Sequence, residues 1–448
     1  MPTDNSRGLV GPGEEPAWEL LQLPNGAQLV LAPMAGRASV AASILVRVGS
    51  RWESKRLAGV SHFLEHMVFK GTEQFPTSRD VSQSIEGLGG VLNASTDKEL
   101  TVFWTKVPGA HLEVALRLLL DLTFAPLILS EEAERERNVI LEELHMYLDQ
   151  PGDLVQMIFD DLLWGDHPLS RDPVGTRFSL ARIGAPELVA HRATYYVPDR
   201  VVVVITGGFD AERAVGLVER CFDERAGATE PRRSRRTNGG TPAPLEAHTA
   251  TRIRKRRGEQ VHLLLGVRCS SYLDPARWAL DVLNTVLGEG MSSRLFLELR
   301  ENRALAYDVH SFAARHLDSG AFGIYMATQT HQVETAIRAA LSEVARMAHE
   351  PLTAEELERS KTQTEGRLRL QLEGTSAMAE FLGHQAALVG SVMSPAEVIA
   401  AVRAVSSEDV QATAERLFSG SGSGWRLAAV GPGLELDPVQ AAFEAGFE

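Results

Sequence analysis

The sequence has few cysteines and no apolar run long enough to cross a membrane. Its two cysteines, Cys221 and Cys269, exclude a disulfide framework and a cysteine-rich zinc knuckle in a chain of 448 residues. The best apolar stretch, residues 114–129, is interrupted by an arginine, an aspartate and a proline, whereas a membrane span needs about 20 mostly apolar residues. We therefore predict that the protein has no membrane partner.

Basic residues are also scarce relative to acidic ones. The 45 Lys and Arg against 59 Asp and Glu give a net charge of −14, and an acidic chain repels nucleic acid on average. The first residues lack the basic and apolar regions of a signal peptide, and their acidic side chains argue against a transit peptide. We expect a cytoplasmic protein that binds no nucleic acid. Two basic clusters, at 232–236 and 252–257, are the one feature that favours nucleic-acid binding. We interpret them instead as a solvated linker and a strand edge.

The chain does contain a regular alternation of strand and helix signals. With 44% hydrophobic and 23% charged residues, its composition is that of a globular protein. In the first half, apolar runs predict strands at 18–23, 28–32, 40–48, 91–95, 100–106 and 200–205. Helical periodicity predicts helices at 57–69, 81–88, 111–122, 130–148 and 186–196.

The second half of the chain repeats these signals in the same order. Strands are predicted at 261–267, 321–327 and 425–430, and helices at 275–287, 353–372 and 408–417. Residues 226–247 are rich in Gly, Pro, Thr and Arg without an apolar period, which is typical of a linker. We predict two homologous α+β units, 1–225 and 248–448, each an antiparallel-rich mixed sheet with helices packed on it.

The pentapeptide His62-Phe63-Leu64-Glu65-His66 is the sharpest chemical signal. Histidines four residues apart on a helix point to one side and can bind one metal ion, and Glu65 lies close to that face. A carboxylate in this place can take a proton from a metal-bound water. The spacing H-x-x-E-H is the inverted form of the zinc-binding H-E-x-x-H. The alternative is an amphipathic helix with two hydrogen-bonded histidines.

A catalytic zinc site needs a third protein ligand and keeps its fourth position for water. The helix predicted at 130–148 offers three candidates, Glu136, Glu142 and Glu143. Glu142 and Glu143 differ by about 100° around the helix, and composition alone does not choose between them.

Four segments, in this order, are similar to the motifs of one known family. They are V-G-S-R-W-E (48–53), S-H-F-L-E-H-M-V-F-K-G-T (61–72), G-G-V-L-N-A-S-T (89–96) and E-R-N-V-I-L-E-E-L (136–144). The chain resembles the pitrilysin, insulinase and mitochondrial-processing-peptidase family of zinc metalloendopeptidases, and within it the compact two-domain bacterial members. The resemblance extends over nearly the whole chain, including the duplicated second half.

The resemblance implies a zinc site and a role for each of its residues. The family pattern makes His62, His66 and Glu143 the ligands of one Zn²⁺ per chain, with Glu143 matching the Glu of the V-I-x-x-E string. Glu65 matches the general base, which takes a proton from the zinc-bound water and gives it to the leaving amine. Glu136, two helical turns before Glu143, matches a second acid that would hold the site by hydrogen bonding. The alternative for Glu136 is a solvated surface acid.

The second half resembles the family without its zinc ligands. Asp281, Asn284 and Thr285 stand where the first half has the H-x-x-E-H residues. Arg300 and Tyr307 match the family's Arg and Tyr that reach the substrate carbonyl beside the zinc, and both are suitable donors to a developing oxyanion. Without the resemblance, Arg300 would be interpreted as a surface helix charge and Tyr307 as a packed strand residue.

The resemblance also implies how a peptide binds. Residues 89–96 match the family's edge strand beside the zinc, to which a peptide adds by backbone hydrogen bonds; Asn93 and Ala94 are the candidate contacts, and an ordinary strand is the alternative. In the family, the two halves close like a clamshell around a chamber. We therefore expect a zinc endopeptidase acting on short or unfolded peptides, and a homodimer. The alternative is a catalytically silent, processing-peptidase-like or core-like binding or assembly subunit.

Overall fold

The computed structural model describes residues 6–7, 17–226, 250–418 and 424–447. Contacts divide the chain into two compact units. Unit 1 consists of Met1–Leu144, Arg171–Gly239 and Arg369–Ala396. Unit 2 consists of His145–Ser170, Gly240–Leu368 and Glu397–Glu448.

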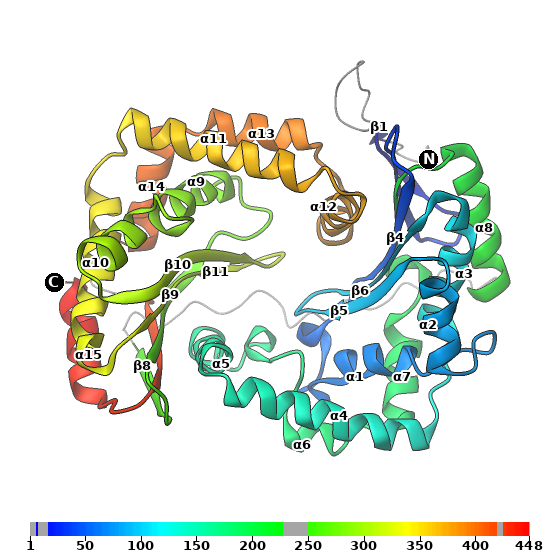
Figure 1. Ribbon diagram of the computed structural model, residues 1–448, viewed down its shortest axis with the longest axis horizontal. Helices are drawn as coiled ribbons and strands as arrows, with labels where there is room; N and C mark the ends of the chain where they lie inside the picture. The colour runs from blue at the N-terminus through cyan, green and yellow to red at the C-terminus, as the bar shows by residue number, and fades with distance from the viewer. Residues whose placement is uncertain (1–5, 8–16, 227–249, 419–423, 448) are drawn as a thin grey trace. The chain divides into compact units, whose positions relative to one another are not determined.

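A seven-stranded mixed sheet forms the centre of unit 1 (Figure 1). Its strands follow the order β1 (Ser6–Arg7), β2 (Glu19–Gln22), β3 (Gln28–Pro33), β7 (Val201–Gly207), β4 (Ser39–Val46), β6 (Thr101–Pro108) and β5 (Val91–Thr96). All neighbours are antiparallel except β3 and β7, which run parallel. The β5 strand is therefore the outer strand at one edge of the described sheet.

Unit 2 contains a five-stranded sheet with the same topology. Its order is β10 (Ala306–Arg315), β11 (Gly320–Thr328), β9 (Val261–Cys269), β12 (Arg426–Gly431) and β8 (Ala250–Lys255). In the opposite direction, β8-β12-β9-β11-β10 reproduces β3-β7-β4-β6-β5 of unit 1, and only the first pair of each series is parallel. The predicted duplication of an α+β unit is confirmed.

Helices cover both sheets. The following helices lie wholly or mostly in unit 1: α1 (Val60–Val68), α2 (Ser78–Glu86), α3 (Leu112–Phe124), α4 (Ser130–Asp149), α6 (Arg177–Leu180), α7 (Ala185–Tyr195), α8 (Ala211–Ala226) and α12 (Thr375–Leu388). Unit 2 has α5 (Pro151–Trp164), α9 (Arg277–Gly288), α10 (Val333–His349), α11 (Ala354–Gln371), α13 (Pro395–Ala404), α14 (Ser407–Phe418) and α15 (Leu436–Glu444). In the described part of the chain, no helix is both long and apolar enough to span a bilayer.

Two helices have exchanged units. The α5 helix follows α4 directly and α12 follows α11, so the two occupy equivalent places in the duplicated order. The α5 helix packs on β9 and β12 of unit 2, whereas α12 packs on β4 and β7 of unit 1. In Figure 1, α12 lies beside β4, and Ser39 and Thr375, 336 positions apart in sequence, come within 3.4 Å.

The predicted domain division differs from these units in two segments. Dividing the chain at 226–247 assigns 145–170 to the first domain and 369–396 to the second, whereas contacts assign each to the other unit. The reason is the exchange of α5 and α12, which helical periodicity does not reveal: it shows that a helix has an apolar face, not which sheet covers it. The predicted linker lies, apart from Ala226, outside the described residues.

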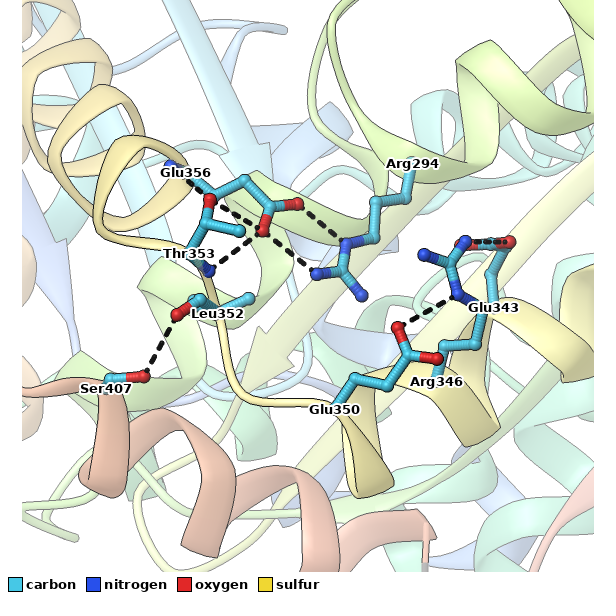
Figure 2. Close-up of polar contacts among 8 residues, drawn as sticks. All are labelled: Arg294, Glu343, Arg346, Glu350, Leu352, Thr353, Glu356 and Ser407. Atoms are coloured by element: carbon cyan, nitrogen blue, oxygen red, sulfur yellow. Dashed lines mark hydrogen bonds and ion pairs between the residues drawn. The ribbon is translucent and has the colours of Figure 1, made fainter.

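The helical segment that begins at Arg294 in unit 2 is fixed to the start of α11 by an ion pair (Figure 2). Arg294 donates from Nε and Nη2 to the two carboxylate oxygens of Glu356, at 2.9 and 3.1 Å. Glu356 also accepts a hydrogen bond from the backbone N–H of Thr353, and its own N–H donates to the Thr353 hydroxyl. This reciprocal pair caps the helix, and the bidentate geometry is directional. The start of this helical segment, which follows α9 in the sequence, is therefore held against α11.

A buried ion pair supports the segment that leads into α1. Arg51 Nη1 lies 2.7 Å from Glu99 Oε1, and the two residues are 1% and 5% exposed. The backbone N–H of Arg51 also donates to the carbonyl oxygen of Lys98, at 2.9 Å. The segment before α1 is thus tied to the turn between β5 and β6.

We expect Glu99→Ala to lower the free energy of unfolding by about 3–5 kcal/mol, because it leaves the Arg51 guanidinium buried without this carboxylate. Urea unfolding followed by circular dichroism measures the change. The matched control is Glu86→Ala on the exposed side of α2, where we expect a change within about 0.5 kcal/mol. A loss for Glu99→Ala no larger than that of the control would show that the ion pair does not stabilise the fold.

Candidate metal centre

Helix α1 carries the H-x-x-E-H residues and is fixed by its apolar side. Phe63, Leu64 and Met67 are fully buried, which sets the rotation of the helix. The helix begins after Gly59, whose φ is +95°, and a Cβ there would lie 2.7 Å from the carbonyl oxygen of Val174. Only glycine fits where the chain turns into this helix.

The structure brings together three side chains from α1 and α4. The Nε2 atoms of His62 and His66 are 3.2 Å apart. Oε2 of Glu143 lies 3.4 Å from Nε2 of His66 and 3.7 Å from Nε2 of His62. Among the described residues, these three side chains form the one group of three or more His, Cys, Asp or Glu whose ligand atoms all lie within 4.8 Å of one another. Glu142, left open by composition, is not part of the group.

These separations fit a tetrahedral metal ion. With ligand bonds of about 2.0–2.1 Å, two donor atoms on a tetrahedral Zn²⁺ lie about 3.3 Å apart. In His62 it is Nε2 that faces the other two donor atoms, whereas Nδ1 is buried and has no hydrogen-bond partner within the described part of the chain. Two imidazoles and one carboxylate are also a donor set of zinc sites that keep a position for water.

The two histidines differ in protonation. Burial and the neighbouring His66 lower the pKa of His62 to about 4, so its Nε2 lone pair is available at neutral pH. Burial would also lower the pKa of His66, but its hydrogen bonds to Glu136 and Glu143 outweigh burial and raise the pKa to about 9. A proton on His66 therefore balances the nearby carboxylates, and a bound cation would replace that proton.

Glu65 lies beside this group and is held by the edge strand β5. The hydroxyl of Thr96 donates a hydrogen bond to Oε2 of Glu65 at 2.5 Å. Burial raises the pKa of Glu65 above its usual value, and the hydrogen bond from Thr96 offsets part of that rise. A carboxylate with a raised pKa accepts a proton more readily than an exposed one. Thr96 ends the edge-strand motif at 89–96, but no spacing in the sequence indicates its contact with Glu65.

Glu136 contacts the far side of the His66 ring. Its Oε1 atom lies 2.9 Å from Nδ1 of His66, and its other oxygen forms an ion pair with Lys70. Glu136 is 6% exposed, so the alternative of a solvated surface acid does not hold. The hydrogen bond fixes the tautomer and orientation of the ring, so that Nε2 faces Glu143. The sequence pattern did not indicate the role of Lys70.

A second buried carboxylate holds the start of α1. Glu53 accepts the backbone N–H groups of Gly59 and Ser61, each at 2.7 Å, immediately before His62. Burial is the largest effect on its pKa, which rises to about 7. Glu53 lies in the V-G-S-R-W-E motif, but no spacing rule connects it with the histidines, because the contact depends on the loop between them.

Comparisons with known proteins identify the family. Residues 29–177 match the family model described as Insulinase (Peptidase family M16), and residues 182–364 match the one described as Peptidase M16 inactive domain. An uncharacterized zinc protease of Streptomyces coelicolor is 34% identical over 418 residues, 92% of this chain and 88% of that protein. The chain belongs to peptidase family M16. An uncharacterized zinc protease of Bacillus subtilis is 35% identical, over 91% and 97% of the two chains.

Solved structures share the M16 fold of this chain. A protease from Helicobacter pylori superposes with a TM-score of 0.85 at 21% identity, over 94% of this chain and all of the other. A Pseudomonas fluorescens structure described as a peptidase M16 inactive domain gives a TM-score of 0.84 at 20% identity, with the same coverage. At these identities, the likeness concerns the fold alone.

The unit 2 counterpart of the site has no histidine and no converging group of three metal-binding side chains among the described residues of this M16 chain. Asn284 and Thr285 on α9 donate hydrogen bonds to the two carboxylate oxygens of Glu289, at 2.8 and 3.0 Å. Arg367 on α11 lies 2.6 Å from the same carboxylate. Internal polar contacts therefore occupy this place, and the described residues contain no second metal-binding group.

Arg300 and Tyr307 lie close together in unit 2. Arg300 belongs to the π-helical segment Phe296–Asn302 and Tyr307 to β10. The guanidinium carbon lies 5.0 Å from the ring centroid of Tyr307, and Tyr307 is 73% exposed, so the packed-strand alternative is wrong. Ala304, between them in the sequence, has a φ of +50°. Among the described residues it is the one non-glycine residue with a positive φ, a backbone conformation that favours glycine.

Asn93 and Ala94 lie in the middle of β5. Asn93 is exposed, and its Oδ1 accepts a hydrogen bond from the backbone N–H of Ala94 at 2.8 Å. The β5 strand pairs only with β6 in the described sheet, which leaves its outer edge open to an added strand.

We expect Glu53→Gln to change how stability depends on pH. The folded-state pKa of about 7 exceeds the ordinary value of 4.5, so the folded protein keeps a proton that the unfolded chain releases, and rising pH destabilises the fold. Between about pH 5.5 and 7.5, this group should remove about 2 kcal/mol from the free energy of unfolding. Urea unfolding with a chelator present should show this extra loss in the wild type and not in Glu53→Gln. Equal losses would contradict the assignment.

Proposed function

We propose that this M16 chain is a zinc-dependent endopeptidase that hydrolyses short or unfolded peptides. One observation carries the proposal: the donor atoms of His62, His66 and Glu143 lie together, with the buried carboxylate of Glu65 on the same helix as the histidines. The relatives from Streptomyces coelicolor and Bacillus subtilis, both named as zinc proteases, support the same function.

Each residue of the group has a chemical role in this proposal. His62, His66 and Glu143 would hold the ion, which when bound supplies a water of lowered pKa. Glu65 accepts a proton from the attacking water and gives it to the leaving amine. The hydrogen bond from Thr96 occupies Oε2 of Glu65 and leaves Oε1 to exchange the proton.

Peptide binding in this proposal uses residues from both units. The open edge of β5, with Asn93 and Ala94, binds the peptide backbone. Arg300 and Tyr307 donate hydrogen bonds to the carbonyl oxygen as negative charge develops on it. Two units that enclose the peptide would exclude folded proteins. That the enzyme is a cytoplasmic homodimer without nucleic-acid or membrane partners stays a prediction.

A catalytically silent binding or assembly subunit is the alternative function. In the family that the sequence resembles, such subunits usually lose a histidine or a glutamate of the zinc motif, whereas this chain retains all of them. Metal analysis and a quenched-peptide assay separate the two functions. One zinc per chain with chelator-sensitive cleavage supports the enzyme; no zinc and no cleavage supports the assembly subunit.

We expect Glu65→Gln to keep its zinc and to lower kcat for peptide hydrolysis by about 100- to 10,000-fold, because it removes the proton acceptor and none of the ligands. Metal content and kcat are measured on the same preparation. Glu86→Gln, the same change on the exposed side of α2, serves as the control and should leave both values unchanged. Near-full activity of Glu65→Gln would overturn the role of Glu65.

We expect Glu143→Gln to weaken zinc binding by more than about 100-fold, since loss of an outer-sphere partner alone costs about 10- to 100-fold. Glu142→Gln is the matched control, because it makes the same change one position away on α4, outside the group of donor atoms. Competition with a chromophoric chelator measures both affinities. Weaker binding in Glu142→Gln than in Glu143→Gln would assign the third ligand to Glu142.

A further inference from the structure

Arg300 of unit 2 lies against two aromatic rings. Its guanidinium carbon is 4.8 Å from the ring centroid of Phe296 and 5.0 Å from that of Tyr307. Within the described part of the chain, Arg300 forms no hydrogen bond or ion pair. Its side chain is exposed, so a charged group with five N–H donors faces solvent without an acceptor from the protein.

The two acids of the helical segment that carries Arg300 do not take up this charge. Glu298 pairs with Arg303, whose Nε lies 2.6 Å away, and it also accepts a hydrogen bond from Asn302 at 3.1 Å. Glu301 follows Arg300 directly, and side chains one position apart on a helix do not face each other. The guanidinium is therefore available to an acceptor that comes from outside the chain.

Contact with aromatic rings suits this role because it leaves the donors exposed. A guanidinium is planar and stacks on a ring through its face, whereas its N–H groups project from its edge. A carboxylate would instead occupy two of these N–H groups as a bidentate partner. For an exposed cation, one ring contact is worth about two- to fivefold in an equilibrium. Ring contacts restrict the flexible side chain before an acceptor arrives, which lowers the cost of ordering it.

Phe296 lies beside the core of unit 2 and not within it. Leu295 and Leu299 are fully buried and belong to the core cluster. Phe296 is half-buried and is not one of the described residues that make up or pack against this cluster. It stands four positions before Arg300, on the same side of the helical segment. Its ring has no polar group, so it interacts with the guanidinium through the ring alone.

The chain after Arg300 turns back and brings Tyr307 to the same guanidinium. The backbone N–H of Leu305 donates to the carbonyl oxygen of Leu299 at 2.7 Å, which closes the turn. Ala304, inside this turn, has the positive φ of +50°. A backbone conformation of this kind costs free energy in a residue other than glycine, and such residues cluster at functional sites. Two elements, the helical segment and β10, thus place a ring against one arginine.

We propose that Phe296 is a positioning residue for Arg300, whose N–H groups it directs toward the carbonyl oxygen of the substrate. The proposal rests on the proposed function, because it takes Arg300 as a donor to the developing oxyanion. A donor that is already oriented stabilises the transition state without reorganising. Loss of the ring therefore lowers kcat and leaves KM nearly unchanged.

The test replaces Phe296 by leucine, which keeps an apolar side chain and removes the ring. We expect Phe296→Leu to lower kcat for peptide hydrolysis about three- to 30-fold, with KM within about twofold of the wild type. Phe296→Tyr keeps the ring and should keep kcat within about twofold. Phe178→Leu, the same change at an exposed phenylalanine of α6, is the matched control and should leave both values unchanged.

A double-mutant cycle separates positioning from packing. In an Arg300→Ala background, Phe296→Leu should change kcat by less than about twofold, because the ring then has no guanidinium to hold. An equal loss of kcat in both backgrounds would overturn the proposal, since Phe296 would then act on the fold or on the substrate itself.

NMR of arginine-labelled protein gives a readout without turnover. An aromatic ring shields protons that lie over its face, so the Hδ protons of Arg300, identified by their absence in Arg300→Ala, should resonate upfield. Phe296→Leu should move this signal downfield, and Phe296→Tyr should not. An unmoved signal in Phe296→Leu would overturn the proposal even if the wild type cleaves peptides. Absence of chelator-sensitive cleavage in the wild type would instead overturn the proposed function, and the NMR signal would still decide whether Phe296 holds Arg300.

Discussion

The convergence of His62, His66 and Glu143 depends on how firmly α1 is held in unit 1. Three separate interactions fix this helix: the burial of its apolar side, the carboxylate of Glu53 on its first N–H groups, and the hydrogen bond between Glu136 and the His66 ring. Donor atoms about 3.3 Å apart leave little tolerance for rotation, because a shift of 1 Å would break tetrahedral geometry. The supporting residues therefore matter as much as the donors.

The duplicated unit shows what this arrangement becomes without metal ligands. The strand order and the single parallel pair are the same in both sheets, so the fold does not need the histidines. In unit 2, Asn284 and Thr285 hold the carboxylate of Glu289, and Arg367 balances its charge. Buried polar groups need partners, and these internal contacts give the Glu289 carboxylate the partners that a bound metal ion would otherwise supply. The same fold thus accommodates either a converging group of donor side chains or a set of internal polar contacts at this place.

Most elements of the fold were predictable from local patterns. The predicted strands and helices appear with ends that differ by three residues or fewer, because apolar periodicity and caps are local signals. The spacing of His62 and His66 was enough to predict a shared metal ion, but composition could not separate Glu142 from Glu143. The contact of Glu53 and the place of α12 remained hidden, since both depend on which surfaces meet after the chain has folded.

The helix exchange makes each unit depend on both halves of the chain. Without α12, the face of the first sheet that includes Leu45 and Val204 would lose its cover, and without α5, Leu264 of the second sheet would lose its contact with the cluster around Phe159. Each fully buried side chain of this kind stabilises the fold by about 1.5–3 kcal/mol relative to exposure. Residues 1–225 therefore contain every proposed zinc ligand without the helix that completes their unit.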